Sequence, residues 1–114
     1  INLPADARGP IQMYPTVDSR FVYLADQGYY FDQPIGRSIF KIDLTTNQVV
    51  NTIEIGNGPH GVTLSSGNRF VYVTNLLDGD VAAIDTVTDE IVWKVAVGKE
   101  PNGISSWPGQ PLGK

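Results

Sequence analysis

The chain has 114 residues, of which 41% are hydrophobic and 10% aromatic, and this is the composition of a folded globular protein. Its formal net charge of −4 provides no basic surface for nucleic acid, and the absence of cysteine excludes disulfides and thiolate metal sites. The sequence contains no apolar run long enough to span a bilayer. We therefore expect neither a nucleic-acid partner nor a membrane span.

Eight short segments rich in Val, Ile, Tyr, Phe and Thr follow one another along the chain, and each is bounded by Gly, Asn, Asp or Pro. This pattern is typical of β-strands separated by tight turns. No segment shows a sustained apolar period of 3.6 residues, so we expect essentially no helix. The predicted strands are 11–16, 21–26, 38–44, 49–55, 61–66, 70–75, 80–85 and 91–97.

These strands form two copies of one structural unit. The segment RFVYLAD at 20–26 is nearly repeated as RFVYVTN at 69–75, and the segment at 39–56 aligns with that at 81–98. Tyr23 and Tyr72 are 49 positions apart, whereas the later segments are 42 apart, so the first copy carries seven extra residues. The extra residues lie within 26–38. A repeat of about 40 to 45 residues with four strands predicts a blade of a β-propeller.

The second copy resembles a repeat of the YVTN β-propeller family. The motifs that carry the resemblance are Pro59-His60-Gly61, Tyr72-Val73-Thr74-Asn75, Ile84-Asp85 and Val97-Gly98. The resemblance implies an all-β fold of blades with four antiparallel strands, in one segment covering 1–114. Blade one is expected at about 9–56 with its insertion at 26–38, blade two at about 57–98, a lone inner strand at about 103–107 and a tail at 108–114.

About two and a quarter blades cannot close a ring, because propellers have about four to eight blades. We expect the remaining blades to come from another chain or from sequence missing here. The opening INLPADARGP is typical of a connection from a preceding blade, and PGQPLGK is typical of a chain end. These ends favour the C-terminal part of a larger propeller over a ring of identical copies, which remains an alternative.

The insertion and the loops that precede the first strands are expected at one end of the blades, since strands alternate in direction. This end would carry Asp32, Leu76, Leu77, Asp78 and Asp80 together with the candidate binding residues Tyr29, Tyr30, Phe31, Arg37, His60 and Asn102. Three consecutive aromatic residues in a loop indicate either a partner contact or packing over the neighbouring blade.

His60 is the only histidine. Related propeller subunits of periplasmic redox systems use the central face for a cofactor. The resemblance therefore implies that His60 could act as an axial haem ligand, a copper ligand or a general base. Because Asn102 occupies the equivalent place in the next repeat, a residue that stabilises a turn is the favoured interpretation, and we predict no catalytic residue, metal or cofactor. Asp78 and Asp80 are interpreted as hairpin residues rather than calcium ligands, and Asp43 and Asp85 as residues that bond the backbone of the next turn.

Two functions remain. The preferred hypothesis is a non-catalytic segment of a larger propeller that acts as a binding scaffold with a protein partner, outside the cytoplasm. The alternative is the propeller portion of a periplasmic oxidoreductase whose haem, copper or quinone centre lies mostly in missing residues.

Overall fold

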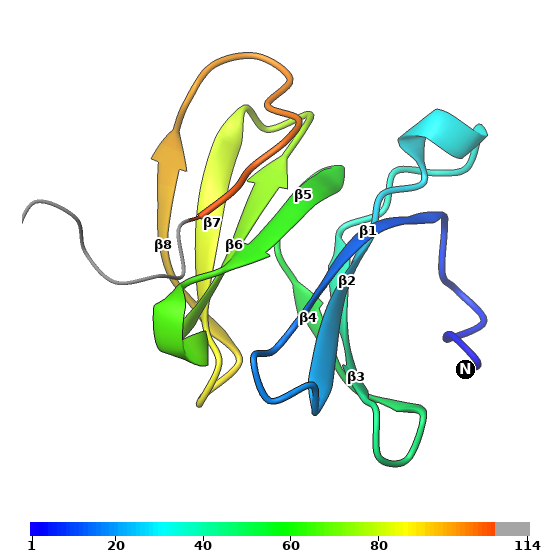
Figure 1. Cartoon of the computed structure of the whole chain (residues 1–114). Helices are drawn as coiled ribbons and strands as arrows, with labels where there is room; N and C mark the ends of the chain where they lie inside the picture. The colour runs from blue at the N-terminus through cyan, green and yellow to red at the C-terminus, as the bar shows by residue number, and fades with distance from the viewer. Residues whose placement is uncertain (107–114) are drawn as a thin grey trace, which may run out of the picture.

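The computed structural model describes residues 1–106, which form two four-stranded antiparallel sheets (Figure 1). Blade one consists of β1 (Pro10–Pro15), β2 (Phe21–Asp26), β3 (Ser38–Asp43) and β4 (Gln48–Glu54). Blade two consists of β5 (Pro59–Leu64), β6 (Phe70–Asn75), β7 (Asp80–Asp85) and β8 (Glu90–Ala96). Over these residues the predicted all-β architecture of four-stranded blades is confirmed, and the two blades leave the ring open.

All eight predicted strands are present, with their ends within two residues of the expected positions. The described residues contain no α-helix, but they contain two 3₁₀ turns, η1 (Tyr29–Phe31) and η2 (Ser66–Asn68). Among residues 1–106, no helix has the length and apolar character needed to cross a membrane.

The predicted lone strand is not formed over its described part, 103–106. A strand is defined by backbone bonds to a neighbour, whereas this segment contacts β5 through a side chain. The Ser106 hydroxyl donates to the Leu64 carbonyl at 2.5 Å and lies 3.0 Å from Thr63 Oγ1. Trp107 and the predicted tail at 108–114 lie outside the described residues.

The turns that follow β3 and β7 have the same construction. Asp43 accepts a hydrogen bond from the Thr45 backbone N–H, and Asp85 accepts one from that of Val87, each at 2.8 Å. The two hydrogen bonds confirm the predicted role of the repeated aspartates. The pKa of Asp43 is lowered chiefly by a hydrogen bond from the Thr45 hydroxyl at 2.6 Å and next by the Thr45 N–H, and that of Asp85 chiefly by the Val87 N–H.

One hydrophobic core lies between the blades. Alternate residues of each strand point to opposite faces of a sheet, so each blade directs one apolar set toward the other. The core contains Tyr23, Ala25, Ile39, Ile53 and Ile55 from blade one and Val62, Leu64, Val71, Val73, Ala82 and Ile84 from blade two. Each fully buried Val, Leu or Ile side chain of this core contributes about 1.5–3 kcal/mol, and this burial holds the two sheets together.

A polar cluster around Asp89 joins the blades at the edge of this core. Asp89, in the hairpin between β7 and β8, forms an ion pair with Lys41 of β3 at 3.2 Å and accepts a hydrogen bond from Asn51 Nδ2 at 3.0 Å. The Lys41 ammonium lies 4.7 Å from the centre of the Phe21 ring. Burial raises the pKa of Tyr23, and so does the negative Asp89 carboxylate, to which the Tyr23 hydroxyl donates a hydrogen bond.

Asp89→Asn should lower the free energy of unfolding by about 1.5–3 kcal/mol, since it leaves the Lys41 ammonium largely buried without a counter-charge. Asparagine tolerates the left-handed backbone at this position, where φ is 56°. Urea unfolding measures the change. Asp32→Asn is the matched control, because Asp32 is exposed and also left-handed, with φ of 53°. Equal unfolding energies for Asp89→Asn and the control would contradict the role of the cluster.

Candidate binding face

The insertion between β2 and β3 is fixed at its base by backbone hydrogen bonds. The N–H groups of Gln27 and Gly28 both donate to the Gly9 carbonyl, and the Gly36 N–H donates to the Gln27 carbonyl at 2.6 Å. A Cβ atom at position 36 would lie 1.9 Å from the Asp26 carbonyl oxygen, so only glycine fits there. The insertion therefore has a tightly closed stem.

The stem presents Tyr29, Tyr30 and Phe31 as the single 3₁₀ turn η1, which we name the aromatic turn. The Phe31 ring packs against the backbone of Gly9, where a Cβ would approach the ring to 2.4 Å. The three side chains remain 46%, 52% and 49% exposed, in chain order. The aromatic turn thus packs on the protein with about half of its surface and exposes the other half.

His60 lies in β5 beneath the aromatic turn and is only 5% exposed. The Tyr30 ring meets the imidazole edge-on, with ring centres 5.6 Å apart and planes at 77°. Burial lowers the pKa of His60 below its usual value, and the nearby Asn102 carbonyl opposes this shift. Nδ1 is buried and has no hydrogen-bond partner among the described residues. This burial favours the neutral form of the His60 imidazole.

The glycine after His60 allows a close approach between two segments of chain. A Cβ at Gly61 would lie 2.5 Å from the Asn102 carbonyl oxygen. The Thr74 hydroxyl links both segments, since it accepts the Gly61 N–H and donates to that carbonyl, each at 2.8 Å. The structure thus brings together Tyr30, His60 and the backbone of Asn102. Asn102 as a whole is exposed.

Arg37 makes different contacts from those of the aromatic turn. Its guanidinium donates to Glu54 Oε1 at 3.0 and 3.1 Å and also to Asn57 Oδ1. Asn57 in turn donates to the Asp78 carboxylate from its backbone N–H and its side-chain amide, both at 2.8 Å. This polar chain ties the end of blade one to a loop of blade two.

The acidic residues of the same loop are bonded to amide groups. Asp80 accepts a hydrogen bond from Asn75 Nδ2 at 2.7 Å, and Asp78 is held by Asn57. Among residues 1–106 no group of three or more His, Asp or Glu side chains is arranged to hold a metal ion. The less favoured interpretation, His60 as a ligand of haem or copper, would need further ligands from outside the described residues.

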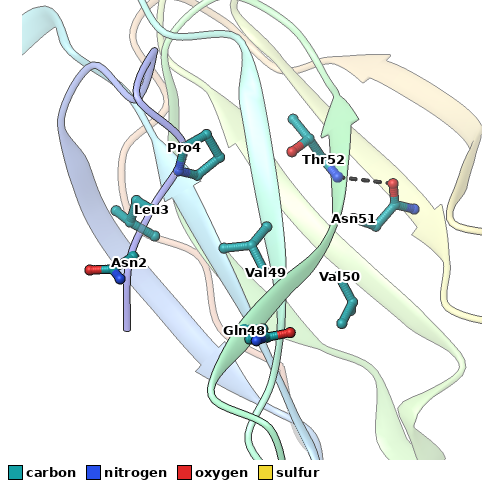
Figure 2. A pocket seen from close by; sticks show the side chains of 8 residues that line it. All are labelled: Asn2, Leu3, Pro4, Gln48, Val49, Val50, Asn51 and Thr52. Atoms are coloured by element: carbon teal, nitrogen blue, oxygen red, sulfur yellow. Dashed lines mark hydrogen bonds between the residues drawn. The ribbon is translucent and has the colours of Figure 1, made fainter.

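Sequence reasoning missed an open cleft on blade one of about 490 Å³. Figure 2 shows Leu3 and Pro4 facing Val49 of β4 across it, with the Thr52 N–H bonded to the Asn51 side chain at 2.9 Å. The lining residues are Asn2, Leu3, Pro4, Gln48, Val49, Val50, Asn51 and Thr52. They supply amides, one hydroxyl and apolar groups but no acid or base, and no signal in the sequence places 2–4 beside β4.

His60 should give the chain a pH-dependent stability. Because the folded pKa lies below the unfolded value of about 6.5, this contribution is complete above pH 6.5 and is lost as pH falls toward the folded pKa. Unfolding energies measured between about pH 5 and 7 isolate this effect, since ordinary carboxylates titrate near pH 4. His60→Asn, which copies the residue at 102, should remove the slope, and an unchanged slope would contradict the assignment.

Solved structures show the same fold. Kuenenia stuttgartiensis hydrazine synthase matches with a TM-score of 0.76 and 20% identity over 90% of this chain and 27% of that chain. U3-55K matches with a TM-score of 0.71 and 10% identity over 86% of this chain and 29% of that chain. Apo AztD from Citrobacter koseri matches with a TM-score of 0.63 and 13% identity over 82% of this chain and 25% of that chain. At these identities the likeness shows the fold alone.

The chain spans about a quarter of the length of these solved chains. No curated protein matches it. The narrower resemblance to the YVTN repeat family stays a prediction. Residues 10–111 match the model described as "YNCE-like beta-propeller", so the chain belongs to the YNCE-like β-propeller family.

Proposed function

We propose that the chain is part of a non-catalytic propeller scaffold that binds a protein partner through the aromatic turn. The observation that carries the proposal is the half-exposure of Tyr29, Tyr30 and Phe31 side by side on a closed stem. Adjacent exposed aromatic residues are uncommon on monomer surfaces and are enriched at protein interfaces.

The rigidity of the stem supports this proposal energetically. Binding costs free energy whenever a loop must be ordered. Here the Gln27 side chain accepts the Tyr30 N–H at 3.3 Å, and the Phe31 N–H donates to the Gly28 carbonyl at 2.9 Å. Because the turn is already held in this way, a partner can bury its aromatic side chains with little loss of conformational entropy.

In this proposal His60 supports the turn, and Arg37 and Asn102 provide the polar surroundings. His60 contacts the Tyr30 ring from below, whereas Arg37 and Asn102 are both exposed. Interfaces commonly combine a few aromatic anchors with a polar rim. The resemblance to the YVTN family leads us to propose further that the scaffold works outside the cytoplasm.

Tyr30→Ser/Phe31→Ser should weaken partner binding at least about thirtyfold, since loss of an interface hot spot costs about 2 kcal/mol or more. Immobilised wild-type chain and variant would be exposed to an extract of the native source. A partner that is retained by the wild-type chain and not by the variant is then purified. Calorimetry measures its affinity for both chains, and hydrogen exchange measures whether it protects the amides of 29–31 in the wild-type chain.

The matched control is Val87→Ser. Val87 is 80% exposed in the hairpin between β7 and β8, at the other end of the strands. Circular dichroism and thermal unfolding must show that both variants keep the fold. A partner that binds the Tyr30→Ser/Phe31→Ser chain as tightly as the wild-type chain would overturn the proposal.

A further inference from the structure

His60 is a buried titratable side chain that lies directly beneath the aromatic turn. It is the only histidine of the chain and is 5% exposed. The ordinary pKa of histidine, about 6.5, makes it the side chain that changes charge in a mildly acidic medium. A change of charge beneath the aromatic turn in this pH range therefore falls on His60.

Within the repeat, a histidine occurs only at this position. The residues equivalent to His60 are Ile11 in blade one and Asn102 after blade two, and neither side chain titrates. The insertion also occurs only once, because in blade two the short loop 76–79 joins β6 to β7. The one histidine therefore coincides with the one insertion that covers it.

The surroundings of the imidazole suit its neutral form. Tyr30 covers the ring from the aromatic turn, Thr74 and Asn75 lie on the paired strand β6, and the Asn102 carbonyl lies near the ring. None of these groups is charged. Burial and the Asn102 carbonyl are the influences on the pKa of His60, and no charged side chain among residues 1–106 is one of them. A positive charge on the ring would therefore have no counter-charge.

Protonation changes what the ring needs from its surroundings. The neutral imidazole has one N–H, whereas the protonated ring has an N–H on both nitrogens and a positive charge. Nδ1 of His60 is buried and has no hydrogen-bond partner among residues 1–106, so the new N–H would lack an acceptor there. The Tyr30 ring offers at most a cation–π contact, which is weaker than hydration or a paired carboxylate. Tyr30 is half-exposed and can move to admit water.

We propose that the charge of His60 controls the aromatic turn: the neutral imidazole supports Tyr30, and the protonated imidazole releases the turn so that water reaches Nδ1. A local opening breaks two hydrogen bonds of the turn, from the Tyr30 N–H to the Gln27 side chain and from the Phe31 N–H to the Gly28 carbonyl. The consequence for binding rests on the proposed function. A partner held by the aromatic turn at neutral pH is released in a mildly acidic medium.

Hydrogen exchange of single amides, followed by NMR without any partner, tests the opening. The closed turn disfavours the charged ring, so it is fully favoured above about pH 6.5 and loses this advantage as pH falls. The protection factor of the Phe31 amide should therefore fall at least about threefold between pH 7 and pH 5. It should fall at most about thirtyfold, the limit set by a pKa of about 6.5 in the open turn.

The Asn68 amide is the matched control within the same chain. It donates to the Ser65 carbonyl in η2, which is also a single 3₁₀ turn, lies at the other end of the strands and contains no histidine. Its protection should stay constant between pH 7 and pH 5. The comparison of Phe31 with Asn68 needs only the wild-type chain, so it can be read even if a variant folds poorly.

Two variants assign the effect to His60. His60→Asn, which copies the residue at 102, should remove the pH dependence at Phe31. Asp32→Asn should keep it, because this change removes only an exposed carboxylate at the end of the turn. Circular dichroism checks that both variants keep the fold.

Three results would overturn this inference: constant protection of Phe31 from pH 7 to pH 5, an equal fall at Asn68, or a fall that persists in His60→Asn. Because no partner is present, these results leave the proposed function standing. A partner that binds the Tyr30→Ser/Phe31→Ser chain as tightly as the wild-type chain would overturn the proposed function and leave the measured opening unchanged.

Discussion

A four-stranded sheet has two faces, and burial of one apolar face of each blade against the other blade is the requirement on which this structure depends. A blade has no helix to cover its apolar face, so the face is buried by packing against another sheet. The two blades share one core. At its edge, Asp89 forms an ion pair with Lys41 and accepts hydrogen bonds from the side chains of Asn51 and Tyr23. The cluster fixes the relative position of the sheets more sharply than apolar packing does, because hydrogen bonds are directional.

The position of the aromatic turn follows from the same packing. The segment that leaves β4 and enters β5 passes between the two blades and is bonded to both. The Ile55 N–H donates to the Arg37 carbonyl, the Gly58 N–H to the Gly36 carbonyl, and the Leu76 N–H to the Gly58 carbonyl. The insertion of blade one is therefore tied to the loops of blade two, which is why Tyr30 meets His60 in the neighbouring sheet.

The features that sequence reasoning predicted are set by local chemistry. Strand positions follow from alternating side chains and turn residues, and the bonds of Asp43 and Asp85 follow from a carboxylate two residues before a free N–H. The contacts of Arg37 with Glu54 and Asn57, the contact between Tyr30 and His60, and the placement of 2–4 beside β4 join parts of the chain that no local pattern relates. The predicted lone strand has no paired neighbour over its described residues, 103–106.

Within residues 1–106 every strand pairs with the strand next to it in sequence, and this has a kinetic consequence. Loop closure costs less entropy when the paired strands are near each other in the chain. Blade one can complete its backbone bonding while blade two is still being synthesised, and Asp89 reaches Lys41 only after β7 has formed. The chain is thus suited to folding in the order in which it is made, one blade at a time.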